Sequence, residues 1–580
     1  MKSVRTLLED HRNGVDVRTT IAEVYARIRA WDDPALFISL KTEADALSEA
    51  AALESGGRRD LPLFGIPFVV KDNIDVAGLP TTAACPAYAY QPTASATIVK
   101  RLVDAGAIVI GKTNLDQFAT GLVGVRSPYG VPRNAVRADL IPGGSSSGSA
   151  SAVAAGLVPF SLGTDTAGSG RVPAALQGIV GLKPSVGAFS LTGVVPACRS
   201  LDCVSVFARS VEDARAVFAV AAAYDADDIY SRHFPRAEPG GWPPGLRLGV
   251  PKPADRIFFG DAQAEAAFGA ALDALERCGA RIIEIDMAPL YETARLLYEG
   301  PWVAERYLVA GKLIRENPDA VHPVTRGIIA GATRHDAGSV FAATYRLMAL
   351  RRQVAPLWAS FDALVVPTIP TVYTRAELEA DPVTLNSNLG TYTNFVNLLD
   401  LAALAVPSTP RGDGLPAGIT FIAPAGRDAF LAGLGMALEG SAAETRVDRP
   451  GIIEIAVVGA HMSGMPLNPQ LTERGATFLR KGETRPDYRL YRLEGSEPGR
   501  PGLIRVEPGQ GTAIALEVWA MPTDQVGSFL TLIPQPLGLG TLTLADGTTP
   551  KGFICEADAA RTGTDISRFG GWRAYLASRE

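Results

Sequence analysis

The sequence has no run of 18 consecutive apolar residues, the length that a membrane-spanning helix requires. The longest candidate, NFVNLLDLAALAVP at residues 394–407, contains Asp400 and ends at a proline. The N-terminal segment also lacks the apolar core and the small-residue cleavage site of a signal peptide. These absences argue against a membrane span and predict a cytoplasmic protein with no membrane partner.

Clusters of lysine and arginine are also missing. The net charge of −6 argues against a nucleic-acid surface, which needs a basic patch. The five cysteines form an odd and scattered set. Cys198 and Cys203 have no second pair at zinc-ligand spacing, so we expect the reduced thiols of a cytosolic protein. We expect neither a metal nor a cofactor.

The chain has 580 residues, 47% of them hydrophobic, and is too long for a single core. Residues 20–31 place apolar side chains on one helical face, and the apolar run at 66–70 is typical of a buried strand that ends at Lys71. Helix and strand signals alternate in this way along much of the chain, which predicts an α/β fold. We also expect helices at 43–54, 264–280 and 338–356, and strands at 107–110 and 361–370.

The segment GSAAETRVDRPG at residues 440–451 is small, polar and ended by Pro-Gly, as a linker between domains commonly is. After it come short apolar segments separated by turns, which indicate strands. We therefore predict a first domain at residues 1–440, a linker at 441–451 and a small β-rich α+β domain at 452–580.

Five serines stand within the nine residues GGSSSGSAS, from Gly143 to Ser151. Ser146 lies in a Gly-x-Ser-x-Gly frame, but a nucleophile elbow needs a strand just before it and a suitable histidine later in the chain. The preceding residues end in Pro-Gly-Gly; of the five histidines, His233 lies in a polar loop, His322 precedes a proline and His335 follows Arg334. A histidine triad therefore stays open but has weak support. A phosphate-binding loop is excluded because Gly148 is followed by Ser149 rather than by lysine.

A serine can instead be activated by a neutral lysine acting through a second hydroxyl. Such a lysine must be desolvated enough to lose its proton near neutral pH. Lys71, at the end of the apolar run, is the best-placed candidate, and Lys112 in VIGKTN is its rival. Spacing alone leaves open that either one is a solvated lysine at a strand end.

The segment PGGSSSGSASAVAAGLVPFSLGTDTAGSGRVPAALQGIVGLKPS at residues 142–185 resembles the long motif of the amidase signature family. The blocks GIPFVVKDNIDVAGLPTT and GKTNLDQFA resemble that family too. The resemblance implies a large mixed β-sheet flanked by helices over residues 1–440. Position by position, it implies that Ser169 is the nucleophile, Ser145 a bridging serine in a cis peptide bond, and Lys71 the base.

Ser169 lies in TAGSG, whose small residues let main-chain N–H groups converge on one point. We expect an oxyanion hole there, formed by the four residues Thr166, Ala167, Gly168 and Ser169. Asp165 and Arg171 are expected to pair and to hold this loop.

Ala167 replaces the first of two glycines that usually precede the nucleophile in the family. With this alanine, GTDTAGSGRVPAA resembles the allophanate hydrolases, as do residues 297–307 and 386–407. That resemblance implies a homodimer that hydrolyses allophanate (N-carboxyurea) to ammonia and N-carboxycarbamate. It also implies that Tyr298 and Arg306 bind the substrate carboxylate. Their spacing of eight residues predicts that both side chains lie on one face of one helix.

The segment VVGAHMSGMPLNPQL resembles the opening of γ-glutamyl cyclotransferase-like domains, but that family's catalytic acid is not evident after LEVWAMPTDQVGSFL. The subfamily's His-x-x-Gly pattern, here His461 to Gly464, implies a site that handles N-carboxycarbamate. The alternative is a domain that only stabilises the protein while decarboxylation proceeds unaided.

Three rival functions remain for the whole chain. It could be an amidase for another small amide, the glutaminase-type subunit of a tRNA-dependent amidotransferase, or a scaffold without activity. The additional C-terminal domain argues against the second, and the presence of Lys71, Ser145 and Ser169 argues against the third.

Overall fold

The computed structural model describes residues 1–235, 237–440, 452–493 and 499–579, so the predicted linker at 441–451 lies outside the described residues. The chain divides into two compact units. The first consists of Met1–His233, Leu248–Arg277 and Ile282–Asp428, and the second of Phe234–Arg247, Cys278–Arg281 and Ala429–Glu580.

An 11-stranded mixed sheet forms the centre of the first unit, which confirms the large mixed sheet that the motifs imply. β2 runs parallel to both β3 and β4, whereas β6 runs antiparallel to β4. In sheet order the strands are β1 (Phe37–Leu40), β3 (Ile108–Thr113), β2 (Pro67–Lys71), β4 (Phe160–Asp165), β6 (Cys203–Ala208), β5 (Val180–Lys183), β10 (Leu401–Pro407), β11 (Gly418–Pro424), β9 (Ala363–Pro367), β7 (Arg247–Pro251) and β8 (Arg281–Ile285).

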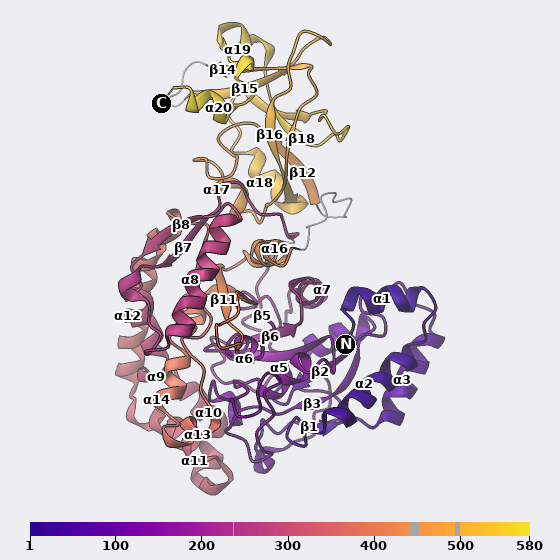
Figure 1. Cartoon of the computed structure of the whole chain (residues 1–580), viewed down its shortest axis with the longest axis vertical. Coiled ribbons are helices and arrows are strands. Elements are labelled where there is room, and N and C mark those ends of the chain that lie inside the picture. The colour runs from indigo at the N-terminus through magenta and orange to yellow at the C-terminus, as the bar shows by residue number, and fades with distance from the viewer. Residues whose placement is uncertain (236, 441–451, 494–498, 580) are drawn as a thin grey trace. The chain divides into compact units, whose positions relative to one another are not determined.

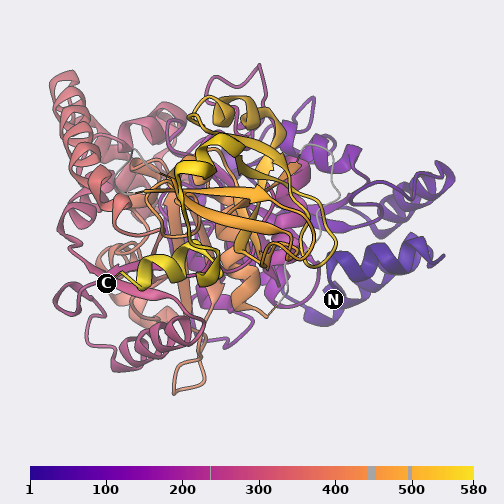
Figure 2. The ribbon, with the colours of Figure 1, turned by 90° about the horizontal axis from the view of Figure 1, so that it is seen from above.

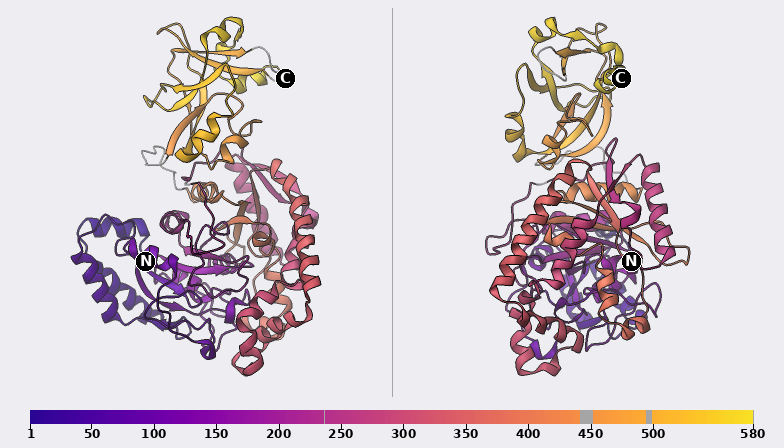
Figure 3. Two further views of the ribbon diagram at one scale, coloured as in Figure 1. Left: turned by 180° about the vertical axis from the view of Figure 1, so that it is seen from behind. Right: turned by 90° about the vertical axis from the view of Figure 1, so that its left-hand side faces the viewer.

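Helices flank this sheet. Figures 1 and 3 show α2 and α3 beside its β1 end, and α8, α9 and α12 at the opposite end. The α-helices up to residue 440 are α1 (Val4–Arg12), α2 (Val17–Trp31), α3 (Glu43–Ser55), α4 (Thr97–Asp104), α5 (Ser147–Ala154), α6 (Val172–Gln177), α7 (Val211–Ala221), α8 (Ala262–Arg277), α9 (Ala288–Glu299), α10 (Val303–Glu316), α11 (Pro323–Ala330), α12 (Ala337–Val354), α13 (Arg375–Ala380), α14 (Thr384–Leu389), α15 (Phe395–Leu398) and α16 (Asp428–Leu438). All of α16 after Asp428 belongs to the second unit.

The local sequence accounts for these boundaries. Asp16 and Thr42 cap the N-termini of α2 and α3 by accepting main-chain hydrogen bonds, and Asp32 ends α2 in the left-handed region at φ 48°. The apolar run before Lys71 forms β2, all five residues of which are buried. The expected helices at 43–54, 264–280 and 338–356 are α3, α8 and α12, and the expected strands are β3 and β9.

The segment LYEGPWVAERY is not one helix, and this corrects the expectation for residues 297–307. α9 ends at Glu299 and α10 begins at Val303. The break falls at Gly300 and Pro301, because proline has no N–H for a helical hydrogen bond and glycine disfavours the helix interior. Tyr298 therefore lies at the end of α9, and Arg306 lies in the first turns of α10.

The second unit is rich in β-structure, as predicted. Its five-stranded sheet has the order β13 (Thr477–Glu483), β16 (Ala515–Pro522), β12 (Ile452–Val457), β18 (Lys551–Cys555) and β17 (Leu537–Thr541), and Figure 2 shows these strands in orange and yellow. A three-stranded sheet has the order β15 (Arg500–Arg505), β14 (Tyr488–Leu493) and β19 (Thr564–Asp565). Its short helices are α17 (Pro469–Thr472), α18 (Val526–Leu530), α19 (Ala557–Thr562) and α20 (Trp572–Ala577).

Within the described parts of both units, none of the helices combines the length and the apolar character needed to span a bilayer.

Candidate active site

Lys71, the last residue of β2, points into a buried polar cluster of the first unit. Its Nζ lies 2.7 Å from Ser145 Oγ and 2.6 Å from Thr164 Oγ1. Burial lowers the pKa of Lys71 to about 7, although the carboxylates of Asp116, Asp202 and Asp165 act in the opposite direction. A substantial fraction of this amine is therefore neutral at physiological pH, as a lysine base requires.

Ser145 connects Lys71 to Ser169. Its Oγ lies 3.0 Å from Ser169 Oγ, and both side chains are buried. The Gly144–Ser145 peptide bond is cis, as the family resemblance implies. Three residues separated by 74 and 24 positions in the chain thus form one continuous line of hydrogen bonds.

Asp116 holds the loop that borders this line, and sequence reasoning did not single it out. Its carboxylate accepts hydrogen bonds from the main-chain N–H groups of Val123 (3.2 Å), Gly124 (2.9 Å) and Arg126 (3.0 Å). The same loop places the carbonyl oxygen of Gly121 3.5 Å from Ser169 Oγ. The one available signal was the position of Asp116 within the block GKTNLDQFA.

The loop of residues 166–170 has the features expected of an oxyanion hole. Among the hydrogen bonds of the described residues, none uses the main-chain N–H of Thr166, Ala167, Gly168 or Ser169. Gly168 adopts a φ of 140°, which side-chain-bearing residues rarely adopt. Four donors at one turn are therefore left for a ligand.

Asp165 and Arg171 pair across the ends of this loop, which confirms the expected contact. Both side chains are fully buried, and the guanidinium makes two hydrogen bonds of 2.9 Å to the carboxylate. Asp165 also accepts from the N–H of Gly170 at 3.0 Å. This bidentate pair fixes the backbone of the loop between them.

Although Tyr298 and Arg306 come from different helices, the fold brings them together. Arg306 is 2% exposed, and its Cζ lies 5.7 Å from the centre of the Tyr298 ring. Tyr298 packs on the apolar cluster that contains Ala167 and Cys198. Ala167 is part of the predicted oxyanion loop, so Tyr298 packs on the same apolar cluster as a residue of that loop.

The guanidinium of Arg306 is only partly satisfied. Nη1 donates to Cys198 Sγ at 2.9 Å, while the buried Nε has no partner. Within the described residues, no hydrogen bond engages Nη2 either. The edge formed by Nε and Nη2 is the one that binds a carboxylate side-on, and here it is unused.

Ser146 and Lys112, the alternative nucleophile and the alternative base, have other interaction partners. Ser146 Oγ hydrogen-bonds the main chain of Thr164, and no strand directly precedes Ser146. Lys112 pairs with Asp72 at 3.1 Å and donates to Thr81. In the described part of the chain, no histidine hydrogen-bonds to Ser145, Ser146 or Ser169. The nucleophile-elbow interpretation of Ser146 therefore lacks both its strand and its histidine.

His461, in the second unit, has a well-defined setting of its own. Its ring stacks on Phe553 at 4.9 Å and meets Phe529 edge-on at 5.4 Å. Nε2 lies 2.9 Å from the amide oxygen of Gln470, so the ring proton is on Nε2 and Nδ1 is the basic nitrogen. Burial lowers the pKa of His461, which keeps the ring neutral at physiological pH.

Glu517, which sequence reasoning passed over, organises the loop after His461. Its buried carboxylate accepts from the N–H and the hydroxyl of Ser463, at 2.7 and 2.9 Å, and from Arg573 at 3.0 Å. Gly464 follows with a φ of 70°. His461 and Gly464 thus belong to one loop that an internal carboxylate fixes.

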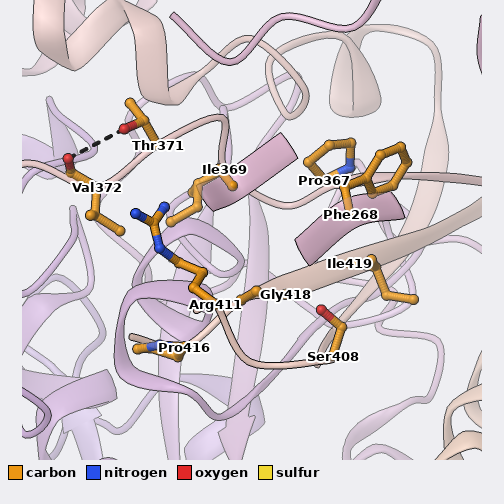
Figure 4. Close-up of a pocket in the computed structure, with 12 residues that line it drawn as sticks. Phe268, Pro367, Ile369, Thr371, Val372, Ser408, Arg411, Pro416, Gly418 and Ile419 are labelled. Atoms are coloured by element: carbon orange, nitrogen blue, oxygen red, sulfur yellow. Dashed lines mark hydrogen bonds between the residues drawn. The ribbon is translucent and has the colours of Figure 1, made fainter. Parts of the chain in front are cut away.

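A pocket elsewhere in the first unit is unconnected with these residues (Figure 4). Arg411, which lines it, is already paired with Asp261 and Asp413. Apolar side chains such as Phe268, Ile369 and Ile419 form much of its wall. None of the predicted site residues lines it, so it is not the candidate active site.

Residues 19–431 match the model of the Amidase family, and residues 453–577 match the model of the allophanate hydrolase C-terminal domain. The urea amidolyase of Saccharomyces cerevisiae is 44% identical over 570 residues, which are 93% of this chain and 31% of that protein. The urea amidolyase of Lachancea kluyveri is 44% identical over 588 residues, 96% of this chain and 32% of that protein. The chain therefore spans about a third of the length of these curated relatives.

A solved structure of the Kluyveromyces lactis allophanate hydrolase is 42% identical, with a TM-score of 0.79, and the match covers 100% of this chain and 99% of that one. A glutamyl-tRNA(Gln) amidotransferase subunit of Deinococcus deserti is 35% identical over 460 residues, 74% of this chain and 93% of that protein.

Proposed function

The chain belongs to the amidase family, and from this membership and the geometry of its site we propose that it hydrolyses allophanate to ammonia and N-carboxycarbamate. One observation carries the proposal: a buried arginine with an unused bidentate edge, Arg306, is linked through Cys198 and Asp202 to Thr166, in the loop that carries Ser169. Allophanate combines a terminal amide, which a serine can attack, with a carboxylate, which that arginine can bind.

The reaction begins with proton transfer along the line. Neutral Lys71 takes a proton from Ser145 while Ser145 takes one from Ser169, whose Oγ attacks the amide carbon. The negative charge that develops on the carbonyl oxygen is stabilised by the free N–H groups of residues 166–169, where one donor contributes roughly 3–4 kcal/mol. The proton then returns through Ser145 to the leaving nitrogen, and ammonia departs.

In the second half of the reaction, water is the nucleophile and Ser169 is the leaving group. A water molecule loses its proton through Ser145 to Lys71 and attacks the acyl group on Ser169. Collapse of the second intermediate breaks the ester bond and returns the proton to Ser169 Oγ. The product is N-carboxycarbamate, and its decarboxylation and breakdown give carbon dioxide and a second ammonia.

Tyr298 and Arg306 bind the substrate carboxylate in this proposal. The Nε and Nη2 hydrogens of Arg306 form a fork that matches two carboxylate oxygens. Tyr298 packs over the guanidinium, and the burial of Arg306 strengthens its interaction with an anion.

We further propose that the second unit acts on N-carboxycarbamate at the loop of His461 and Gly464. The neutral ring held by Phe553 and Gln470 supports this role, because a fixed and basic Nδ1 can hold or move one proton. The match of residues 453–577 to the allophanate hydrolase C-terminal domain supports it as well. It also weighs against a glutaminase-type subunit, since the amidotransferase subunit of Deinococcus deserti aligns with only 74% of this chain.

A homodimer is the proposed assembly. The outer face of α12 supports it, since Phe341, Tyr345 and Met348 are 60%, 70% and 56% exposed there and lie on one helical side. Light scattering should give twice the chain mass, and Tyr345→Glu should reduce it. We also propose a cytoplasmic location, which free cysteines favour.

Biuret tests the substrate assignment because it replaces the carboxylate of allophanate with a carboxamide of nearly the same size. We expect kcat/KM for allophanate to exceed that for biuret by roughly 100-fold or more, the effect of losing one buried charged hydrogen-bond pair. Equal values for the two substrates would replace this proposal with an amidase for another small amide.

A further inference from the structure

A turn from Cys198 to Asp202 lies between the oxyanion loop and α10, and no step of the reaction uses it. The N–H groups of Leu201 and Asp202 both donate to the carbonyl of Cys198 at 2.8 Å, which closes the turn. Cys198 is 0% exposed and Asp202 is 3% exposed. Both ends of the turn are therefore inside the protein, while Arg199 between them is exposed.

At one end the turn is fixed to the oxyanion loop. The Asp202 carboxylate accepts a hydrogen bond from the hydroxyl of Thr166, the first residue of that loop. It also accepts from the N–H groups of Ala197 at 2.9 Å and Cys198 at 3.1 Å. One carboxylate thus fastens the oxyanion loop and the start of the turn to each other.

At the other end the turn holds the first turns of α10. Cys198 Sγ lies 2.9 Å from Arg306 Nη1 and 3.4 Å from the carbonyl oxygen of Trp302. Ser200 donates its N–H to the carboxylate of Glu305 at 2.9 Å, and its hydroxyl also donates there. Through these contacts, the turn holds three residues at the start of α10, and this restricts the position of Arg306.

The chemistry of Cys198 suits a contact of this kind. Burial raises the pKa of its thiol to about 12, so the sulfur is a neutral acceptor for the arginine. A carboxylate at this position would neutralise Arg306 and compete with an anionic substrate. A neutral sulfur orients the guanidinium through Nη1 and leaves the Nε–Nη2 edge for the ligand.

We propose that the turn Cys198–Asp202 is a positioning element that fixes Arg306 relative to the oxyanion loop. By fixing Arg306, the turn selects amide substrates in which only a short spacer separates the carboxylate from the scissile bond. This inference rests on the proposed function, because it assigns to Arg306 the role of carboxylate anchor. Cys198 and Asp202 act through Arg306 and Thr166 and do not touch substrate.

A double-mutant cycle tests the inference. Cys198→Ala removes the acceptor of Nη1 and should raise KM for allophanate about 10-fold, the effect of one hydrogen bond to a charged group, while kcat changes little. Cys198→Ser keeps an acceptor and should restore KM to within about 3-fold of wild type. In an Arg306→Ala background, Cys198→Ala should have no further effect on KM, because the residue it acts through is gone.

Two controls separate positioning from loss of structure. Cys203→Ala removes another buried thiol, which contacts Lys183 rather than Arg306, and should leave KM unchanged. Ser200→Ala removes one contact to Glu305 at the surface side of the turn and should raise KM in the same direction, by about 3-fold. If Cys198→Ala folds poorly, Ser200→Ala still tests whether the turn positions Arg306, with Cys203→Ala as its control.

The outcomes are distinct. Additive effects of Cys198→Ala and Arg306→Ala, or an equal loss on allophanate and biuret, would overturn the positioning role. A wild-type enzyme with no preference for allophanate over biuret would instead overturn the proposed function, before the cycle is measured.

Discussion

The hydroxyl oxygen of Ser145 lies 3.0 Å from that of Ser169, and on its other side it lies 2.7 Å from the amine of Lys71. Ser145 is therefore in contact with both the proposed base and the proposed nucleophile. A proton that moves between Lys71 and Ser169 passes through it.

Replacing Ser145 with alanine should interrupt this proton path without removing the nucleophile. We expect kcat for allophanate to fall by roughly 10³-fold or more, within the range seen when one member of a catalytic unit is lost. KM should change much less, because Ser145 does not contact the carboxylate anchor. Steady-state kinetics of the purified variant check this, and a kcat within 10-fold of wild type would contradict the relay.

The rate should depend on the protonation of Lys71. Burial lowers its pKa to about 7, and only the neutral amine accepts a proton, so activity is lost as the pH falls through this value. We expect kcat/KM to be nearly constant above pH 8 and to fall about 10-fold per pH unit well below 7. A profile that stays flat from pH 6 to 9 would exclude Lys71 as the base.

Breaking the buried pair of Asp165 and Arg171 should destabilise the first unit. Arg171→Ala leaves a fully buried carboxylate without its partner, at a cost of roughly 3–5 kcal/mol in the free energy of unfolding. The matched control is Arg137→Ala, since the Arg137–Asp139 pair is exposed, and exposed pairs contribute about 1 kcal/mol or less. Denaturant unfolding of both variants gives the comparison, and equal losses would contradict a special role for the buried pair.

His461→Ala should leave the first hydrolysis intact and slow the second stage. The variant is expected to consume allophanate at the wild-type rate, while N-carboxycarbamate accumulates and early ammonia release approaches one per allophanate instead of two. A coupled ammonia assay with ¹³C NMR of the products measures both quantities. Wild-type stoichiometry in the variant would leave the second unit with a purely stabilising role.

Much of the site could be predicted from the sequence because its residues stand in local sequence patterns. Lys71 ends an apolar run that had to be a buried strand, and Ser145 and Ser169 fall in a long glycine- and serine-rich motif. The pairing of Asp165 with Arg171 follows from their separation of six residues across one loop. In each case the sequence pattern lies within a few residues of the site residue or contact that it predicts.

The remaining contacts depend on chain segments that meet only in the folded protein. Asp116 is one carboxylate in the mixed block GKTNLDQFA, and its role depends on a loop seven to ten residues away turning back onto it. Cys198 and Arg306 are 108 residues apart, and nothing in either neighbourhood indicates the other. The two-helix arrangement around Gly300 was missed because the spacing of Tyr298 and Arg306 also fits one continuous helix.

We propose that Ser169, and not the serine in the Gly-x-Ser-x-Gly frame, attacks allophanate. The direct measurement is ammonia release from allophanate by Ser169→Ala and by the neighbouring control Ser146→Ala, with folding of both checked by thermal unfolding. We expect Ser169→Ala to lose roughly 10⁴-fold or more of kcat, while Ser146→Ala keeps most of it. Retained ammonia release by a folded Ser169→Ala protein would exclude Ser169 as the nucleophile.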